Sequence, residues 1–163
     1  MDYHEQYLHK VIPPFRLVGV LPNFILLLIR VLAGFALSFV YGAEIFGMPW
    51  TPEEINLSLF EVADWFVVEV SHFGPPFEYM PWLFAWSAGC TMTIGGILLI
   101  LGLNTRATAF FIVATKFITI MFRSWNETWD ILPTFILFCL GLVYILMGSG
   151  RFGMDALLTK RYL

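Results

Sequence analysis

Residues 81–123 have the sequence PWLFAWSAGCTMTIGGILLILGLNTRATAFFIVATKFITIMFR, in which a short connector joins two long apolar segments. The first segment carries no charge between Glu78 and Arg106. At about 1.5 Å per residue, a helix of this length crosses a hydrocarbon layer about 30 Å thick. The second segment is equally apolar apart from one lysine. We therefore predict a hairpin of two transmembrane helices, at about residues 81–102 and 107–123.

Two further apolar stretches predict spans at about residues 23–46 and 131–148. The expected fold is thus an all-α integral membrane domain over residues 1–163, a four-transmembrane-helix bundle embedded in a lipid bilayer. Composition agrees, because 59% of the residues are hydrophobic, only 13% are charged, and the mean hydropathy is +0.79. With a net charge of −3 and no basic cluster, nucleic acid is not expected as a partner.

The segment between the first two predicted spans, residues 47–80, is acidic and contains no Lys or Arg. Thr51 and Pro52, followed by two glutamates, are typical of a helix start, so we predict an extra amphipathic helix at about residues 51–73, in the first outward-facing loop. Its polar face is either solvated or a metal site, and the spacing matches no specific metal motif. We predict no metal site. The acids of the segment are Glu53, Glu54, Glu61, Asp64, Glu69 and Glu78.

The distribution of Lys and Arg predicts the orientation. Most basic residues lie on the side that holds both termini, while the opposite loops hold only Arg123. The positive-inside rule therefore places both termini in the cytoplasm and the acidic segment outside. The expected location is a prokaryotic inner membrane, in which the chain is a multi-pass protein.

Lys116 is the least expected residue of the sequence, because it falls near the middle of the span at 107–123. Inserting Lys at mid-helix costs roughly 2.5–3.5 kcal/mol on translocon scales, so such residues usually face a protein interior and mark a functional site. Lys116, Thr119 and Arg123 share one helix face. The partner of Lys116 stays open: a backbone carbonyl, a threonine hydroxyl, a water-filled cavity, a bound ligand or an acid of the insert.

The first span contains Gly34, Ser38 and Gly42, a row of small residues that favours close helix packing. Arg30, Tyr41 and Glu44 lie toward one side of the same helix at 100° per residue. For Arg30, the alternative is a side chain that snorkels to the headgroups.

At the predicted outer surface, Glu44 ends the first span and Arg123 ends the third, so we expect an ion pair between them. Aromatic and polar residues follow Arg123, and an interfacial belt is the alternative explanation for the tryptophans among them. The candidate ligand-binding residues are therefore Arg30, Tyr41, Glu44, Lys116, Arg123, Trp125, Trp129 and Asp130. The sequence identifies no catalytic residue.

Several stretches, taken in order, resemble the DoxX family of small four-helix membrane proteins. They are residues 26–30 (LLLIR), 41–42 (YG), 46–47 (FG), 95–106 (GGILLILGLNTR) and 148–158 (GSGRFGMDALL). The family includes a subunit of thiosulfate:quinone oxidoreductase. The resemblance therefore implies a membrane subunit of a quinone-linked oxidoreductase or respiratory-type complex, with quinone as ligand, no covalently bound cofactor and other membrane subunits as partners.

The alternative function is a non-catalytic accessory subunit that packs against a larger membrane complex through its aromatic and small-residue faces. No flavin, haem or iron–sulfur motif is recognisable, so in a redox role the electrons would come from a partner. Whether the chain is itself an enzyme stays open at this point.

The orientation is testable with single cysteines placed in a chain that lacks Cys90 and Cys139. Ser58→Cys should react with a membrane-impermeant thiol reagent added to intact cells, and Thr159→Cys should not, because the basic side remains inside. Both should react after the membrane is permeabilised. The reverse labelling in intact cells would contradict the assignment.

Overall fold

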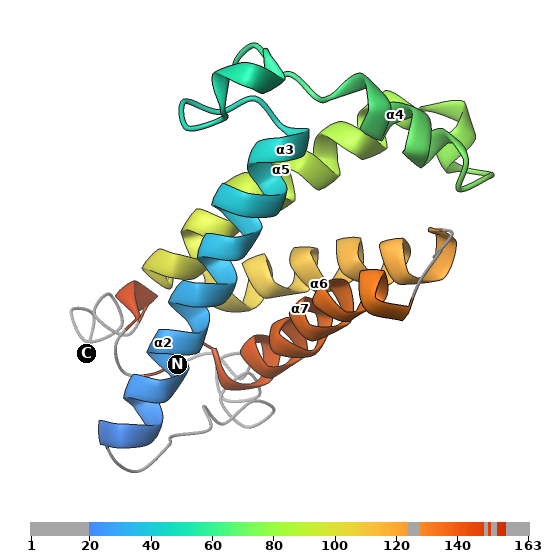
Figure 1. Ribbon diagram of the computed structural model, residues 1–163. Coiled ribbons are helices and arrows are strands. Elements are labelled where there is room, and N and C mark those ends of the chain that lie inside the picture. Colours follow the sequence, from blue (N-terminus) through green and yellow to red (C-terminus); the bar gives the residue numbers. More distant parts are fainter. Residues whose placement is uncertain (1–19, 124–127, 149, 151–152, 156–163) are drawn as a thin grey trace, which may run out of the picture.

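The computed structural model describes residues 20–123, 128–148, 150 and 153–155 (Figure 1). This part of the chain is all-helical, and its only extended pairing is one isolated bridge between Phe46 and Val62. In chain order the elements are α2 (Val20–Phe35), the π-helix η1 (Ala36–Tyr41), α3 (Gly42–Ile45), the 3₁₀ turn η2 (Glu53–Ile55), α4 (Asp64–Ser71), the 3₁₀ turn η3 (Phe77–Tyr79), α5 (Pro81–Leu101), α6 (Thr105–Phe122) and α7 (Thr128–Met147).

Three helices in the described part are long and apolar enough to cross a membrane: Val20–Ile45, which is α2, η1 and α3 in one run, then α5 and α6. The apolar part of α7, Ile131–Met147, is shorter. The four apolar segments predicted from the sequence are therefore helices, with boundaries that differ by a few residues.

The long helices form two pairs (Figure 1). The first pair is α2 packed on α5, and the second is α6 packed on α7. The pairs join at the α5–α6 turn and diverge from there, and α4 lies over the far part of α5. The molecule therefore has a closed end, at the α5–α6 turn, and an open end, beneath the insert.

Small residues bring α2 and η1 close to α5, as the sequence predicted. A Cβ on Gly34 would lie 2.6 Å from the backbone oxygen of Gly96, and one on Gly96 would lie 2.8 Å from that of Gly34. A Cβ on Gly42, the first residue of α3, would lie 2.6 Å from the side-chain methyl of Thr93 in α5. Because the two backbones are in contact at Gly34 and Gly96, no larger side chain fits between them there.

The closed end is held by Asp155, from the segment that follows α7. Its carboxylate accepts hydrogen bonds from the backbone N–H groups of Asn104 (2.7 Å) and Thr105 (3.0 Å). Its own N–H donates to the carbonyl of Gly102 at 3.0 Å. Asp155 thus caps the N-terminus of α6, where a carboxylate satisfies free N–H groups and complements the helix dipole.

Arg30 belongs to this closed end and is only 1% exposed. Its guanidinium lies against Gly102, where a Cβ would be 2.7 Å from Nη1, and it interacts electrostatically with Tyr144 and Asp155. The Tyr144 hydroxyl donates to the carbonyl of Leu26 at 3.1 Å, which ties α7 to α2. Arg30 is therefore an interior structural residue, and its burial excludes the snorkelling alternative.

The amphipathic helix predicted at residues 51–73 is not continuous. Only η2 and α4 are helical within it, and Asn56 and Phe60 have positive φ values of 49° and 64°. The intervening chain pairs instead with the end of the first helix run: Gly47 donates to the carbonyl of Glu61 at 2.8 Å and accepts from the N–H of Phe60 at 2.8 Å. Tertiary backbone pairing overrides local helix propensity here.

Adjacent glycines of α5 provide a matched test of the α2–α5 contact. Gly96→Ala should lower the free energy of unfolding by about 1–3 kcal/mol, because its methyl would overlap Gly34 and Ser38. Gly95→Ala should be neutral or stabilising, since a Cβ there meets Thr108 at an ordinary 3.6 Å. Thermal unfolding in detergent measures both, and equal effects would contradict the close contact.

Candidate functional site

A cavity of about 280 Å³ lies at the open end of the molecule. Its walls come from η1 and α3, from α4, and from the facing sides of α5 and α6. Five residues bring charge or a phenol to it: Tyr41, Glu44, Glu69, Lys116 and Arg123. The cavity therefore gathers polar groups from elements far apart in the sequence.

Lys116 is 5% exposed and lines this cavity from α6. Its Nζ donates to the thioether of Met92 at 3.7 Å and lies 5.7 Å from the centre of the Tyr41 ring. Within the described residues it has no ion-pair partner. A thioether and an aromatic face are weak partners for an ammonium group, so Lys116 retains hydrogen-bonding capacity toward the cavity.

Tyr41 is the last residue of the π-helix η1. One extra residue per turn rotates the side chains that follow it, and such π-turns inside helices are frequent at functional sites. Here the distortion lies directly before Gly42, whose backbone contacts Thr93 of α5. The position of the Tyr41 ring beside Lys116 thus depends on a local geometry that regular α-helical periodicity does not predict.

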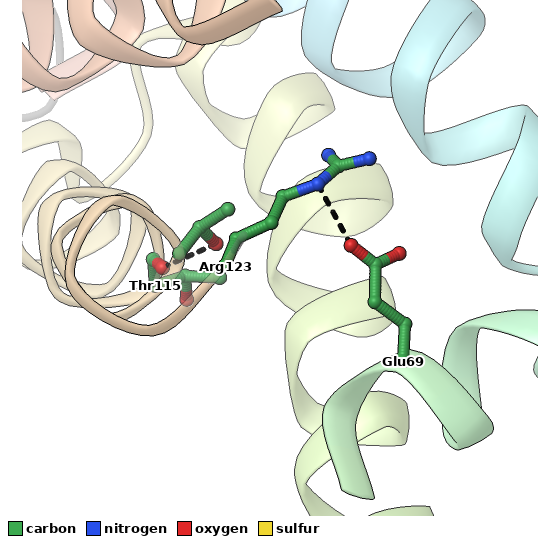
Figure 2. A network of polar contacts seen from close by, with 4 residues as sticks. Glu69, Thr115 and Arg123 are labelled. Atoms are coloured by element: carbon green, nitrogen blue, oxygen red, sulfur yellow. Dashed lines mark hydrogen bonds and ion pairs between the residues drawn. The ribbon is translucent and has the colours of Figure 1, made fainter. Parts of the chain in front are cut away.

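Arg123 closes the cavity on the insert side. Its Nε lies 2.7 Å from a carboxylate oxygen of Glu69, and Figure 2 shows the side chain reaching from the end of α6 to α4. The two side chains are 45% and 24% exposed, so the pair contributes little stability by itself. Its structural effect is to connect α4 to the end of α6 across the open end.

The predicted ion pair between Glu44 and Arg123 is wrong, because Arg123 pairs with a different glutamate, Glu69. Glu44 is exposed and lines the same cavity, but the ion pair that the structure shows for Arg123 is with Glu69. The reason is the folded-back insert, which brings α4 against α5 and thereby carries Glu69 to the end of α6.

Aromatic rings form the apolar wall beneath the insert. Phe77 packs against Phe84 with ring centres 4.8 Å apart and against Phe122 at 5.4 Å. Phe73 stacks on Phe122 at 6.3 Å. These contacts hold the insert on both α5 and α6, so the cavity has an apolar roof with a charged edge at Glu69.

The structure brings four of the predicted site residues to one cavity: Tyr41, Glu44, Lys116 and Arg123. Arg30 lies apart from them, at the closed end. Trp125 lies outside the described residues, as do the side chains of Trp129 and Asp130, so these three stay predictions.

Sequence reasoning missed Glu69, Met92 and the aromatic roof. The sequence places Glu69 on the polar face of the predicted amphipathic helix. The one indication of its position in the cavity is that an acid of the insert is among the possible partners of Lys116. Met92 gave no signal, since a methionine in an apolar helix is ordinary.

The chain is a multi-pass membrane protein in contact with lipid, because several of its helices are long and apolar enough to span a bilayer. These helices surround a buried lysine and a cavity with charged groups at its edge. The chain belongs to the DoxX family, whose model matches residues 25–125. This match confirms the resemblance and spans every residue that lines the cavity. No curated protein and no solved structure matches the chain.

A double-mutant cycle tests the connection between α4 and α6. Glu69→Ala, Arg123→Ala and the double variant should give a coupling of about 0.2–1 kcal/mol that decreases at high salt, as expected for a partly exposed pair. The control cycle, Glu44→Ala with Arg123→Ala, should be additive. Unfolding in detergent gives both couplings, and a larger value for Glu44 would contradict the observed pairing.

Proposed function

We propose that this chain is the membrane subunit of a quinone-linked oxidoreductase and that the cavity beside Lys116 binds the quinone headgroup. The observation that carries the proposal is Lys116 itself, a 5% exposed cation that lines the cavity without a carboxylate partner in the described part of the chain. A ligand that accepts a hydrogen bond or carries partial negative charge would complete this environment.

A quinone fits the distribution of groups around the cavity. Its ring carbonyls are hydrogen-bond acceptors, which Lys116 Nζ and the Tyr41 hydroxyl can serve as donors. The ring itself is flat and apolar, which suits the aromatic wall formed by Phe73, Phe77 and Phe84. Charge that develops on the ring oxygens during reduction would be stabilised by the nearby ammonium of Lys116.

Reduction of a quinone to a quinol takes up two electrons and two protons. In the proposed scheme a partner subunit supplies the electrons, while this chain binds and orients the ring and supplies a route for protons. Glu44 is the residue suited to proton exchange, because it is exposed and also lines the cavity. The proposed setting is a prokaryotic inner membrane with both termini in the cytoplasm, so that Glu44 faces the outside.

Lys116→Met separates this function from a structural role. Met fills a similar volume without a charge to bury, so folding should be retained. Quinone affinity should fall about tenfold or more, equivalent to about 1.4 kcal/mol, because the main hydrogen-bond donor of the cavity is lost. Quinone titration and thermal unfolding are measured on the same purified preparation.

Arg30→Met is the matched control, since it removes the other buried cation from a place outside the cavity. We expect lower stability and, for the folded fraction, unchanged quinone affinity. Wild-type affinity in Lys116→Met together with altered assembly would instead favour the accessory-subunit function.

A further inference from the structure

A second cavity, of about 330 Å³, lies between the first helix run and α7. On one side it is lined by Ile29, Leu32 and Ala36, and on the other by Pro133, Ile136 and Leu140. Tyr41 is the one polar residue in its wall. Apart from Tyr41, the described lining offers no partner for a polar ligand group, but it accommodates hydrocarbon.

Tyr41 also lines the first cavity, beside Lys116. Its ring is therefore the common wall of a polar cavity and an apolar one. From Ile29 to Tyr41 the first helix run extends over about 18 Å at 1.5 Å per residue, so the apolar cavity is bordered by an elongated stretch of helix rather than by a single turn. An elongated apolar space that lies next to a headgroup site, with Tyr41 in the lining of both, suits a hydrocarbon chain better than a second ring.

The two helices that border this space are held together at one end and separate toward the other. The Tyr144 hydroxyl bonds the carbonyl of Leu26 near the closed end, and α7 diverges from α2 away from this contact (Figure 1). Both walls continue into side chains exposed on the outer face of the helices, such as Leu32 and Ile136. The space is thus accessible from the side of the molecule that faces lipid.

We propose that the second cavity binds the apolar tail of the ligand whose headgroup lies beside Lys116, so that the site selects a tailed, membrane-dissolved quinone that arrives sideways from the bilayer between α2 and α7. This inference rests on the proposed function and adds the class of substrate and its route. One ligand then passes beside Tyr41, with its hydrogen-bonding groups on the side of Lys116 and its hydrocarbon on the side of Ile136. The combined volume of the two cavities lies within the range of roughly 300–1,000 Å³ that is usual for ligand sites.

The test compares two probes that share one headgroup, a dimethoxy-methyl-benzoquinone with a decyl tail and the same ring without a tail. Ile136→Trp fills the second cavity from α7 and leaves the first cavity untouched. Ile94→Trp is the matched control, since Ile94 is an exposed isoleucine of α5 that lines neither cavity. Affinities are measured by calorimetric titration of the full chain in lipid nanodiscs.

Ile136→Trp should weaken binding of the decyl quinone by about tenfold, because the tail loses buried apolar contact, and should leave the tailless ring unchanged. Ile94→Trp should leave both affinities unchanged. The unchanged tailless affinity also shows that the variant is folded. Ala36→Phe, which fills the same cavity from η1, should repeat the selective loss.

Equal loss for both probes, or no loss for either, would overturn the tail site and indicate that ordinary lipid chains fill this cavity. In both cases the wild type still binds the headgroup, and the proposed function stands. A wild-type chain that binds neither probe overturns the proposed function together with the tail site.

Discussion

The need to place two cations inside an apolar layer shapes this structure more than any other constraint. A charge there is costly unless the protein surrounds it with suitable groups. Arg30 and Lys116 are both almost fully buried, yet they are accommodated differently. Arg30 lies against the α5–α6 turn, near Tyr144 and the cap residue Asp155, whereas Lys116 lies beside a thioether, an aromatic ring and a cavity. The first arrangement places a carboxylate and a phenol near the cation, and the second leaves room for a ligand.

This difference follows the division of the molecule into a closed and an open end. At the closed end, Asp155 caps α6 and Tyr144 ties α7 to α2, so the helix pairs are connected there by hydrogen bonds. At the open end the described contacts between the pairs are those of the insert, through the aromatic roof and the partly exposed pair of Glu69 and Arg123, and the contacts of Lys116 with Met92 and Tyr41. Weak, exposed contacts are easier to open than buried ones. The cavity therefore lies where the fold can best tolerate a ligand.

The sequence predicted the features that depend on local composition or helix periodicity. These include the apolar helices, the close packing through Gly34 and Gly42, and the inward stripe that carries Lys116. It could not predict features that depend on long-range backbone contacts or on distorted geometry. The predicted surface helix is interrupted because residues near Phe60 pair with Gly47, and the same folding back brings Glu69 rather than Glu44 to Arg123. Regular periodicity likewise contains no signal for the π-helix that positions Tyr41.

The motifs that carry the family resemblance lie mostly away from the cavity. Arg30, the turn at Gly102 to Arg106, and Asp155 all meet at the closed end, where they cap α6 and support the α5–α6 turn. A structural role explains a motif at such a place. Its residues connect the helices at the closed end, and this connection does not depend on which ligand the protein binds. Membership of the family is therefore stronger evidence for the helical scaffold than for a particular function. The evidence for function has to come from the open end, where an occupant of the cavity would offset part of the cost of burying Lys116.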